Sequence, residues 1–409
     1  MRILQINNCH YRRGGADSVY LNTVQLLCKN GNEVFEFSQK NKENEYSKYS
    51  TFFVKEFDSL KLPFYKKFLK TPRQLYSFEA AVKLDYLLKH EKIDIAHIHL
   101  YKGVLTASIL LVLKKHRIPT CITLHDYSLL CPRNILFDGD NKICEKCIKS
   151  STINCVLKRC NRKKILFSIV SFLEFNINNT LFKPENYFKK IISVSKFNYE
   201  KHFVKPNLQN KLVHLYNFFP DCENIKTNDI KGSYFLYFGR LSNEKGLNTL
   251  ISAFSKNTLK YKLKIVGTGL LFDSLHQIIN SKGLSNIELL GYKSGNELNE
   301  LILNCSFIIV PSEWYENNPM TIVEGYSFGK PVIGSRVGGI PELIIDNETG
   351  YNFEMGNVDD LEKKMSLAAS LSINEYKNMS VKARNFAIDN FSEATHYEKL
   401  MEIYYDMIK

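Results

Sequence analysis

The sequence predicts an α/β protein of two domains, each built on a parallel sheet. Three observations support this fold class. The length of 409 residues exceeds what a single hydrophobic core usually serves. Short apolar strands alternate with amphipathic helices in the first half, and the alternation begins again after Pro220. With 44% hydrophobic and 24% charged residues and no low-complexity tract, the composition favours an ordered globular chain.

The first half alternates strands and helices from its start. Residues 3–6 predict a strand, and a helix follows a loop that contains two glycines. Further predicted elements are a helix at 105–113 and strands at 34–37, 93–98, 120–124 and 191–194. Strands separated by helices predict parallel crossovers.

The second half repeats this order. Strands are predicted at 235–238, 263–266, 286–290, 307–310 and 331–333, with a helix at 247–254. The domain boundary is placed near 216–232, where Asp, Asn, Gly and Pro gather. The final segment is predicted to be a helix that packs on a domain surface, because one face carries Tyr397, Leu400, Met401, Tyr404 and Ile408.

The net charge of +13 is unevenly distributed. Residues 1–215 carry 36 Lys+Arg against 18 Asp+Glu, whereas residues 216–409 carry 19 against 24. A basic half suits nucleic acid, anionic lipid or a phosphorylated acceptor.

The nearly apolar run at 103–113 is too short to span a bilayer, so we expect a cytoplasmic or membrane-surface protein with reduced cysteines.

A loop at the end of one predicted strand carries two cations. Gly239 begins the loop, and Arg240 and Lys245 stand on either side of the turn into the next helix. A guanidinium fork and an ammonium at such a turn can grip a diphosphate. Two surface cations on an ordinary loop would give the same pattern.

Two carboxylates follow a later strand. Glu316 precedes a helix whose first residue is predicted to be Pro319, and Glu324 lies one to two turns into that helix. The free N–H groups at the helix start offer an anion site, and the two carboxylates can hydrogen-bond the hydroxyls of a sugar nucleotide. Solvated carboxylates are also common near helix starts.

In their order along the chain, these motifs resemble the retaining glycosyltransferases of family 4. The matching blocks include 239–246, 266–269, 316–324 and 329–332. The resemblance implies the GT-B fold, in which two Rossmann-like domains face each other across a cleft. It also implies an acceptor domain over 1–215, a nucleotide-sugar donor domain over 216–391, and a helix at 392–409 that packs back toward the first domain.

The resemblance also implies roles for single residues. Arg240 and Lys245 would neutralise the donor diphosphate, Glu316 would contact the transferred sugar, and Glu324 the ribose. His125 would lie in the catalytic pocket. The implied mechanism is same-face attack, with the leaving diphosphate taking the acceptor's proton and with no catalytic metal or other cofactor. Further donor contacts would come from Gly14, Gly15, Gly239, Gly267, Tyr292, Asn317, Asn318, Pro319, Met320 and Thr321.

The residues of the first half support this less specifically. His125 follows a predicted strand, and the carboxyl end of such a strand faces the crevice where α/β ligands bind. His97 and His99 alternate on a strand and are expected to be structural. The loop at Gly14 and Gly15 is equally compatible with a plain strand-to-helix turn.

Five cysteines gather in an insertion over residues 131–160. Four of them could hold a structural zinc, and the alternative is a reduced, metal-free set. A catalytic metal is not expected there, because a closed thiolate site leaves no open position. The five are Cys131, Cys144, Cys147, Cys155 and Cys160.

Basic residues interleave with aromatic and aliphatic ones at 61–70 and 158–170. This pattern suits an anionic membrane surface, and a solvated helix face as well. With the resemblance, it leads us to expect a UDP- or GDP-sugar donor and a saccharide acceptor, lipid-linked, at the inner face of the cell membrane. The expected process is cell-surface polysaccharide or O-antigen-type assembly.

Other functions remain open at this point. A zinc-stabilised nucleic-acid-binding protein would explain the basic half and the cysteines, but not Arg240, Lys245, Glu316 and Glu324. A sugar-nucleotide epimerase of the same fold would share the donor motifs. A dinucleotide dehydrogenase is disfavoured, because no GxGxxG follows the first strand.

Overall fold

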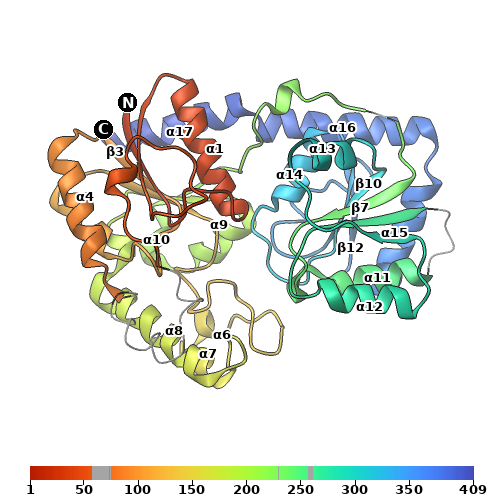
Figure 1. Ribbon diagram of the computed structural model, residues 1–409, viewed down its shortest axis with the longest axis horizontal. Coiled ribbons are helices and arrows are strands. Elements are labelled where there is room, and N and C mark those ends of the chain that lie inside the picture. The colour runs from red at the N-terminus through yellow and green to blue at the C-terminus, as the bar shows by residue number, and fades with distance from the viewer. Residues whose placement is uncertain (58–72, 74, 229, 257–260) are drawn as a thin grey trace. The chain divides into compact units, whose positions relative to one another are not determined.

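The computed structural model describes residues 1–57, 73, 75–228, 230–256 and 261–409. The chain divides into two compact units. The first comprises Met1–Asp140, Cys144–Leu215 and Tyr397–Lys409, and the second comprises Asn141–Ile143 and Tyr216–His396. Within the described ranges, each unit contains one parallel sheet of six strands with helices on both faces (Figure 1).

The first sheet has the strand order β2-β1-β3-β4-β5-β6. The order along the chain reverses between β1 and β3. In open α/β sheets, ligands bind beyond the carboxyl ends of the strands at such a switch point. The strands are β1 (Arg2–Ile6), β2 (Glu33–Phe37), β3 (Ile95–Ile98), β4 (Thr120–Leu124), β5 (Lys190–Ser193) and β6 (Leu212–His214).

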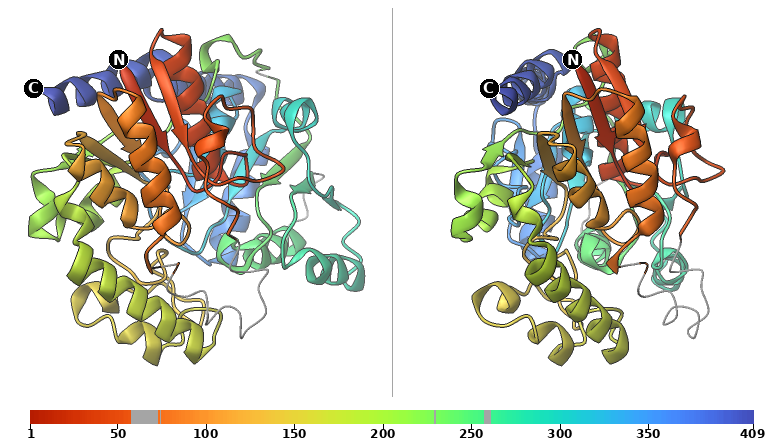
Figure 2. Two further views of the ribbon diagram at one scale, coloured as in Figure 1. Left: turned by 60° about the vertical axis from the view of Figure 1, so that its left-hand side comes forward. Right: turned by 90° about the vertical axis from the view of Figure 1, so that its left-hand side faces the viewer.

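Two helical layers enclose this sheet. Helices α4 and α5 pack with Leu4 and Ile6 on one face. Figure 2 shows the ribbon of this unit from two further sides. Helix α1 packs with Ile3 on the other face. The helices before the second unit are α1 (Gly15–Lys29), η1 (Ser50–Phe52), α4 (Phe78–His90), α5 (Ser108–Lys115), α6 (Lys146–Lys149), α7 (Asn154–Leu157), α8 (Ile165–Ile177), η2 (Asn178–Phe182), η3 (Pro184–Asn186), α9 (Lys196–Phe203) and α10 (Pro206–Gln209).

The helix α17 (Glu393–Ile408) completes the first unit from the far end of the chain. Leu400, Met401, Tyr404 and Met407 are buried with α1 against the first sheet. The packing of this helix on the first domain is therefore confirmed. The prediction that Ile408 lies on the buried face is wrong, because Ile408 is 46% exposed and Met407 occupies that position.

The second sheet has the order β12-β11-β10-β7-β8-β9, with its switch point between β7 and β10. Phe307 and Ile308 of β10 pair directly with Phe235 and Leu236 of β7. The strands are β7 (Tyr234–Phe238), β8 (Lys262–Val266), β9 (Ile287–Leu289), β10 (Phe307–Val310), β11 (Val332–Ser335) and β12 (Gly350–Phe353).

Helices again cover both faces of this sheet. Helices α11, α12 and α15 pack on one face, and α13, α14 and the second half of α16 pack on the other. The helices of the second unit are η4 (Cys222–Asn224), η5 (Asn243–Lys245), α11 (Leu247–Lys256), α12 (Phe272–Ser281), α13 (Gly295–Leu303), α14 (Met320–Ser327), α15 (Val358–Ser370) and α16 (Ile373–Phe391).

One predicted helix starts later than expected. The prediction placed a helix at 105–113, but α5 begins at Ser108. Thr106 has a φ of 64°, and its side-chain oxygen accepts hydrogen bonds from the backbone N–H groups of Ser77 and Ser108. A residue in this left-handed conformation interrupts a right-handed helix, so Leu105 packs in the core from a turn.

Truncation of Leu400 tests the contribution of α17 to the first unit. Leu400 is 1% exposed, so Leu400→Ala should lower the free energy of unfolding by about 2–4 kcal/mol. Urea unfolding followed by circular dichroism measures the change. Tyr405→Ala is the control on the same helix, because Tyr405 is 51% exposed. Equal destabilisation by both variants would contradict the packing described.

Candidate active site

A buried ion pair lies at the switch point of the second sheet. The loop after β7 carries Lys245, and the loop after the adjacent β10 carries Glu316. The Nζ atom of Lys245 donates to Oε1 of Glu316 at 2.6 Å and lies 5.2 Å from the ring centroid of Trp314. The two charges that the sequence placed in separate motifs therefore meet at the edge where such sheets bind ligands.

Glu316 is an ionised carboxylate in a dry position. Its side chain is 8% exposed, and Oε1 also accepts a hydrogen bond from Ser312 Oγ at 2.7 Å. Burial alone would raise the pKa of Glu316. The charge of Lys245 and the hydrogen bonds from Lys245 and Ser312 outweigh burial and hold this pKa below its usual value. The partners thus compensate the desolvation of the charge.

Arg240 is held more loosely. Its guanidinium is 62% exposed and donates to Oε1 of Glu244 at 2.8 Å. The same carboxylate oxygen accepts from Ser242 Oγ at 2.7 Å. An exposed ion pair of this kind contributes little to stability, so the guanidinium can exchange its carboxylate for another anion at small cost.

The segment 317–321 forms the start of α14. Pro319 was predicted as the first helical residue, but its ψ of 114° is extended, and Pro319 is the N-cap before Met320. Asn318 accepts a hydrogen bond from the backbone N–H of Asn217 at 3.0 Å, and Thr321 donates to the carbonyl of Phe238 at 3.4 Å. These contacts fix the helix start beside the end of β7.

Glu324 lies in the second turn of α14 and is mostly buried. Burial raises its pKa to about 7. The two carboxylates thus differ: Glu316 has a cationic partner and stays charged, whereas Glu324 changes protonation near neutral pH.

Glycines allow the loops of this site to touch. A Cβ atom on Gly267, after β8, would lie 1.9 Å from the carbonyl oxygen of Gly239, after β7. Gly338 has a φ of 60°, and its Cβ would lie 2.3 Å from the carbonyl oxygen of Glu316. The next residue, Gly339, donates its N–H to that oxygen at 2.7 Å. The glycine turn therefore fixes the backbone of Glu316.

Tyr292 lies at the same sheet edge, beyond β9. It follows Gly291 and is 70% exposed. In the order β10-β7-β8-β9, this position is two strands away from the switch point on the β8 side. An exposed aromatic ring at this place is available to a planar group.

His125 belongs to the first unit, where it follows β4. Its Nε2 lies 2.9 Å from Nδ1 of His99, which follows the neighbouring strand β3. The two rings stack with centroids 5.2 Å apart. Burial lowers the pKa of His125 to about 4, so this imidazole is neutral at physiological pH.

A hydrogen-bond chain continues inward from His99. Its Nε2 lies 3.2 Å from Oε1 of Gln5, and the Gln5 amide nitrogen donates to the hydroxyl of Tyr404 at 3.2 Å. With the amide in this orientation, His99 Nε2 donates to Gln5, and in a neutral His99 ring Nδ1 accepts from His125 Nε2. Neutral His125 then carries its proton on Nε2.

Gly14 and Gly15 also belong to the first unit. Gly14 is the N-cap of α1 and Gly15 is its first residue, beyond the carboxyl end of β1. The predicted site residues therefore fall into two groups. Those from Gly239 to Glu324 lie in the second unit, and His125 lies with the two glycines in the first.

The cysteine cluster does not fit a zinc site. Three of its members are buried and two are partly buried, and all five are free thiols. Among the described residues, which include all five, no three His, Cys, Asp or Glu side chains form a group that could hold a metal ion. Burial raises the pKa of Cys147 to about 12, and neighbouring thiols contribute to the rise. The zinc prediction is not supported.

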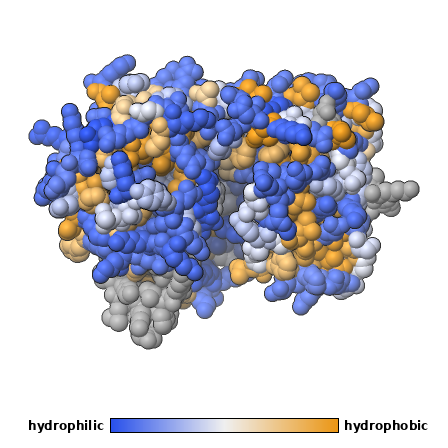
Figure 3. All heavy atoms as spheres, turned by 45° about the horizontal axis from the view of Figure 1, so that its top comes forward, coloured by the Kyte–Doolittle hydropathy of each residue, from blue (hydrophilic) through white to orange (hydrophobic). Residues whose placement is uncertain are grey.

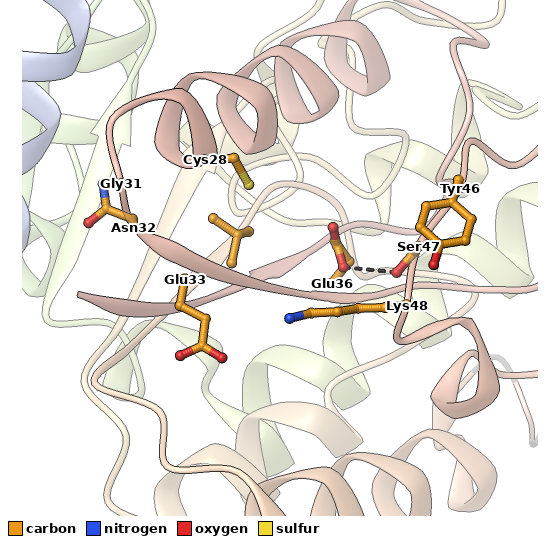
Figure 4. Close-up of a pocket in the computed structure, with 9 residues that line it drawn as sticks. Cys28, Gly31, Asn32, Glu33, Glu36, Tyr46, Ser47 and Lys48 are labelled. Carbon is orange, nitrogen blue, oxygen red and sulfur yellow. Dashed lines mark hydrogen bonds between the residues drawn. The ribbon is translucent and has the colours of Figure 1, made fainter.

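A separate surface cavity of about 540 Å³ opens beside β2 (Figure 4). Ser47 donates to Glu36 Oε2 at 2.8 Å within it. Its lining also includes Gly31 and Asn32, which precede β2. The cavity therefore lies beside β2, the edge strand of the first sheet, and begins at its amino end. It is distinct from the switch points of both sheets.

Sequence reasoning missed part of the site. Ser312 and Trp314 were not singled out, although both precede Glu316 in the same loop. The sequence indicates these two residues only by their closeness to Glu316 along the chain. His99 was expected to be structural, and its contact with His125 was not anticipated. Gln5 was not singled out, and Tyr404 was named only for the apolar helix face, because the bonded pair lies 399 positions apart in the chain.

Two family models match this chain. The model for glycosyl transferases group 1 matches residues 222–386, and the model for glycosyltransferase family 4 matches residues 13–147. Together they cover more than two thirds of the chain. The chain belongs to glycosyltransferase family 4. The resemblance drawn from the motifs is thereby confirmed.

Curated relatives in this family match part of the chain. An uncharacterised glycosyltransferase of Methanocaldococcus jannaschii is 36% identical over 176 residues, which are 43% of this chain and 48% of the relative. The lipopolysaccharide 1,2-N-acetylglucosaminetransferase of Salmonella typhimurium is 27% identical over 186 residues, 42% of this chain and 48% of the relative. The chain thus spans about half the length of these relatives.

Solved structures of similar fold match the whole chain. A glycosyltransferase from Rickettsia africae has a TM-score of 0.70 at 19% identity, covering 100% of this chain and 98% of that one. Anabaena HepE in complex with UDP and glucose has a TM-score of 0.68 at 17% identity, with 98% of each chain covered. At this level of identity the likeness establishes the fold, and the GT-B prediction is confirmed.

The pKa of Glu324 predicts a pH-dependent effect of its neutralisation. Its folded pKa of about 7 exceeds the ordinary 4.5, so ionisation in the folded state destabilises the ligand-free protein. The penalty is absent below pH 4.5, grows as pH rises to 7 and reaches about 3 kcal/mol above it. Glu324→Gln should therefore stabilise the second unit at pH 8 and have little effect at pH 4.5.

Urea unfolding followed by the fluorescence of Trp314, the only tryptophan of the chain, reports on this unit. Glu348→Gln is the control, because Glu348 forms only an exposed pair with Lys382. A gain for Glu324→Gln that is equal at both pH values would contradict the assignment.

Proposed function

We propose that this protein is a retaining glycosyltransferase that moves a hexosyl-type sugar from a UDP- or GDP-sugar to a glycan acceptor. The observation that carries the proposal is the buried Lys245–Glu316 pair at the switch point of the second sheet. A fixed cation and a fixed carboxylate at that place can bind the diphosphate and the sugar hydroxyls of one donor.

UDP is supported most directly as the donor nucleotide. The structure of HepE, which shares this fold, is described in complex with UDP and glucose. A second relative is described as an N-acetylglucosaminetransferase. The exposed ring of Tyr292 would stack on the base, and Glu324 would accept hydrogen bonds from the ribose hydroxyls, which favour its ionised form.

The diphosphate would be neutralised by Lys245 and Arg240. Arg240 is exposed and paired only at the surface with Glu244, so it can turn to the phosphates. The N-terminus of α14 would add the backbone N–H groups of Met320 and Thr321, and Gly14 and Gly15 would contribute those of α1. Gly239 and Gly267 would let the loop backbones approach the donor closely.

Glu316 is proposed to orient the transferred sugar as a fixed negative charge. Its Oε1 already accepts from Lys245 and Ser312, which favours a positioning and electrostatic role over that of a covalent nucleophile. In the reaction, the bond from the sugar's anomeric carbon to the diphosphate oxygen breaks. The acceptor hydroxyl forms its bond to that carbon from the same face, and its proton passes to a leaving diphosphate oxygen.

The neutral imidazole of His125 would bind a hydroxyl of the sugar or the acceptor. The contact with His99, which is itself bonded to Gln5, positions this ring. The low pKa of His125 keeps the ring neutral at physiological pH.

The acceptor is proposed to be a lipid-linked saccharide in cell-surface polysaccharide assembly. Two relatives come from cps regions of Klebsiella pneumoniae, and another acts on lipopolysaccharide by its name. A lipid-linked acceptor would place the enzyme at the cytoplasmic, inner face of the cell membrane.

The first test measures nucleotide diphosphate release from UDP- and GDP-sugars with membrane lipid extract as acceptor. Glu316→Gln and Lys245→Ala should each lower this release at least a hundredfold, because both remove charge that is already fixed at the site. Glu348→Gln and Lys256→Ala are matched controls at exposed ion pairs and should keep the activity.

Donor binding is measured separately by the fluorescence of Trp314, whose ring lies beside Lys245. Conversion of the donor sugar without diphosphate release would instead identify an epimerase. Absence of both binding and release across the donor panel would overturn the proposal.

The hydrogen-bond chain predicts a positioning role for His99. His99→Leu removes the acceptor that fixes the ring of His125, so kcat should fall about tenfold with little change in the donor's KM. His99→Asn retains an acceptor oxygen near the position of Nδ1 and should recover part of the loss. Steady-state kinetics checks this, with thermal melting as the test of folding. Equal kcat for both variants would contradict the role.

A further inference from the structure

Helix α8 and the turn η2 that continues it have an inverted distribution of polar and apolar residues. The residues buried against the first unit include Ser168, Ser171 and Asn178, together with Phe175. Apart from Thr180, the exposed positions are aliphatic: Ile165 is 51% exposed, Leu166 55%, Leu173 48% and Leu181 73%. A surface helix of a globular protein normally buries its apolar face and exposes its polar one.

Polar contacts hold the inward face. Asn161 donates from its side chain to Ser171 Oγ at 2.9 Å and from its backbone to Ser168 Oγ at 3.0 Å. Thr152 donates to Asn176 at 3.1 Å. The helix is thus attached to the preceding segment 152–161 largely by hydrogen bonds, and most of its aliphatic surface remains uncovered.

Neighbouring residues extend this apolar surface. Helix α7 packs beside α8 at one end of the first unit (Figures 1 and 2). Its N-cap residue Ile153 is 41% exposed, and its last residue Leu157 is 71% exposed. By contrast, hydrophilic side chains cover most of the face shown in Figure 3. A contiguous exposed apolar surface rimmed by charge marks an interaction site.

The rim of this surface is basic. Arg159, Arg162, Lys163 and Lys164 are exposed in the segment between α7 and α8. Within the described residues, no acidic side chain forms an ion pair with any of these four, although Arg162 lies over the ring of Phe167 at 5.2 Å. Exposed cations beside aliphatic side chains match the charge and layering of an anionic lipid surface.

The helix cannot act as a transmembrane span in this fold. The stretch Ile165–Asn186 is long and apolar enough to cross a bilayer, and 22% of its apolar 18-residue window is buried. The sequence reading, which took 103–113 as the longest nearly apolar run, overlooked it because Ser and Asn interrupt the stretch. However, β4 before it and β5 after it pair directly in one sheet, so both ends must stay on the same side of a membrane.

We propose that α8 is a membrane-inserting helix that lies in the plane of an anionic bilayer. Its aliphatic face, with Ile153 and Leu157, enters the boundary between headgroups and acyl chains, and the four cations contact anionic headgroups. This inference goes beyond sugar transfer and does not depend on it. The other basic stretch, 61–70, lies outside the described residues.

Cosedimentation of the full chain with vesicles tests the proposal, without any sugar donor. Phosphatidylcholine vesicles are compared with vesicles that contain phosphatidylglycerol as well. The wild type should bind the anionic vesicles, and binding should weaken with added salt. Leu166→Ser combined with Leu173→Ser, and Lys163→Glu combined with Lys164→Glu, should each weaken binding at least tenfold.

Matched control variants come from exposed positions of the second unit. Leu367→Ser with Ile373→Ser, and Lys282→Glu with Lys363→Glu, should leave binding unchanged. Thermal melting verifies that every variant folds.

Failure of the wild type to bind anionic vesicles would overturn the proposal, as would equal losses in the control variants. Self-association without vesicles that the Leu166 and Leu173 changes abolish, combined with no vesicle binding, would assign the face to a second copy of the chain. No sugar donor is present in this experiment. A failure of vesicle binding therefore leaves the transferase proposal standing, and a failure of the transferase assay leaves the membrane proposal standing.

Discussion

The candidate site depends on one buried ion pair, between Lys245 and Glu316. A carboxylate this deeply buried is costly unless a cation and hydrogen-bond donors surround it, and Lys245 and Ser312 supply them. The pair joins the loops that follow β7 and β10, two adjacent strands from distant parts of the sequence. Sheet topology therefore provides the meeting point, and the ion pair fixes the two loops there.

The surrounding backbone is arranged to keep this pair in place. The turn at Gly338 and Gly339 contacts the backbone of Glu316, and Gly267 lies against Gly239. Larger residues at these positions would separate the loops. These glycines therefore let several loops share one small volume at the edge of the sheet.

Much of the fold could be predicted from the sequence because its strands are short, apolar and separated by amphipathic helices. Elements with weak patterns were missed, such as β6 with three residues and α8, whose apolar face points outward. Local conformation also shifted boundaries, as the left-handed Thr106 and the extended Pro319 did. In the site, motif order identified the main charges. The chain from His125 to Tyr404 depends on three-dimensional contacts that no local pattern records.

The position of α17 has a consequence for synthesis on the ribosome. This helix follows the second unit in the chain, yet Leu400, Met401 and Tyr404 close the core of the first. Throughout translation of the second domain, a nascent first domain therefore exposes the apolar surface of the sheet and of α1 that α17 later covers. The first domain therefore cannot complete its folding before the second domain has emerged from the ribosome. Until then, the partly folded first domain can bind chaperones that recognise apolar strands.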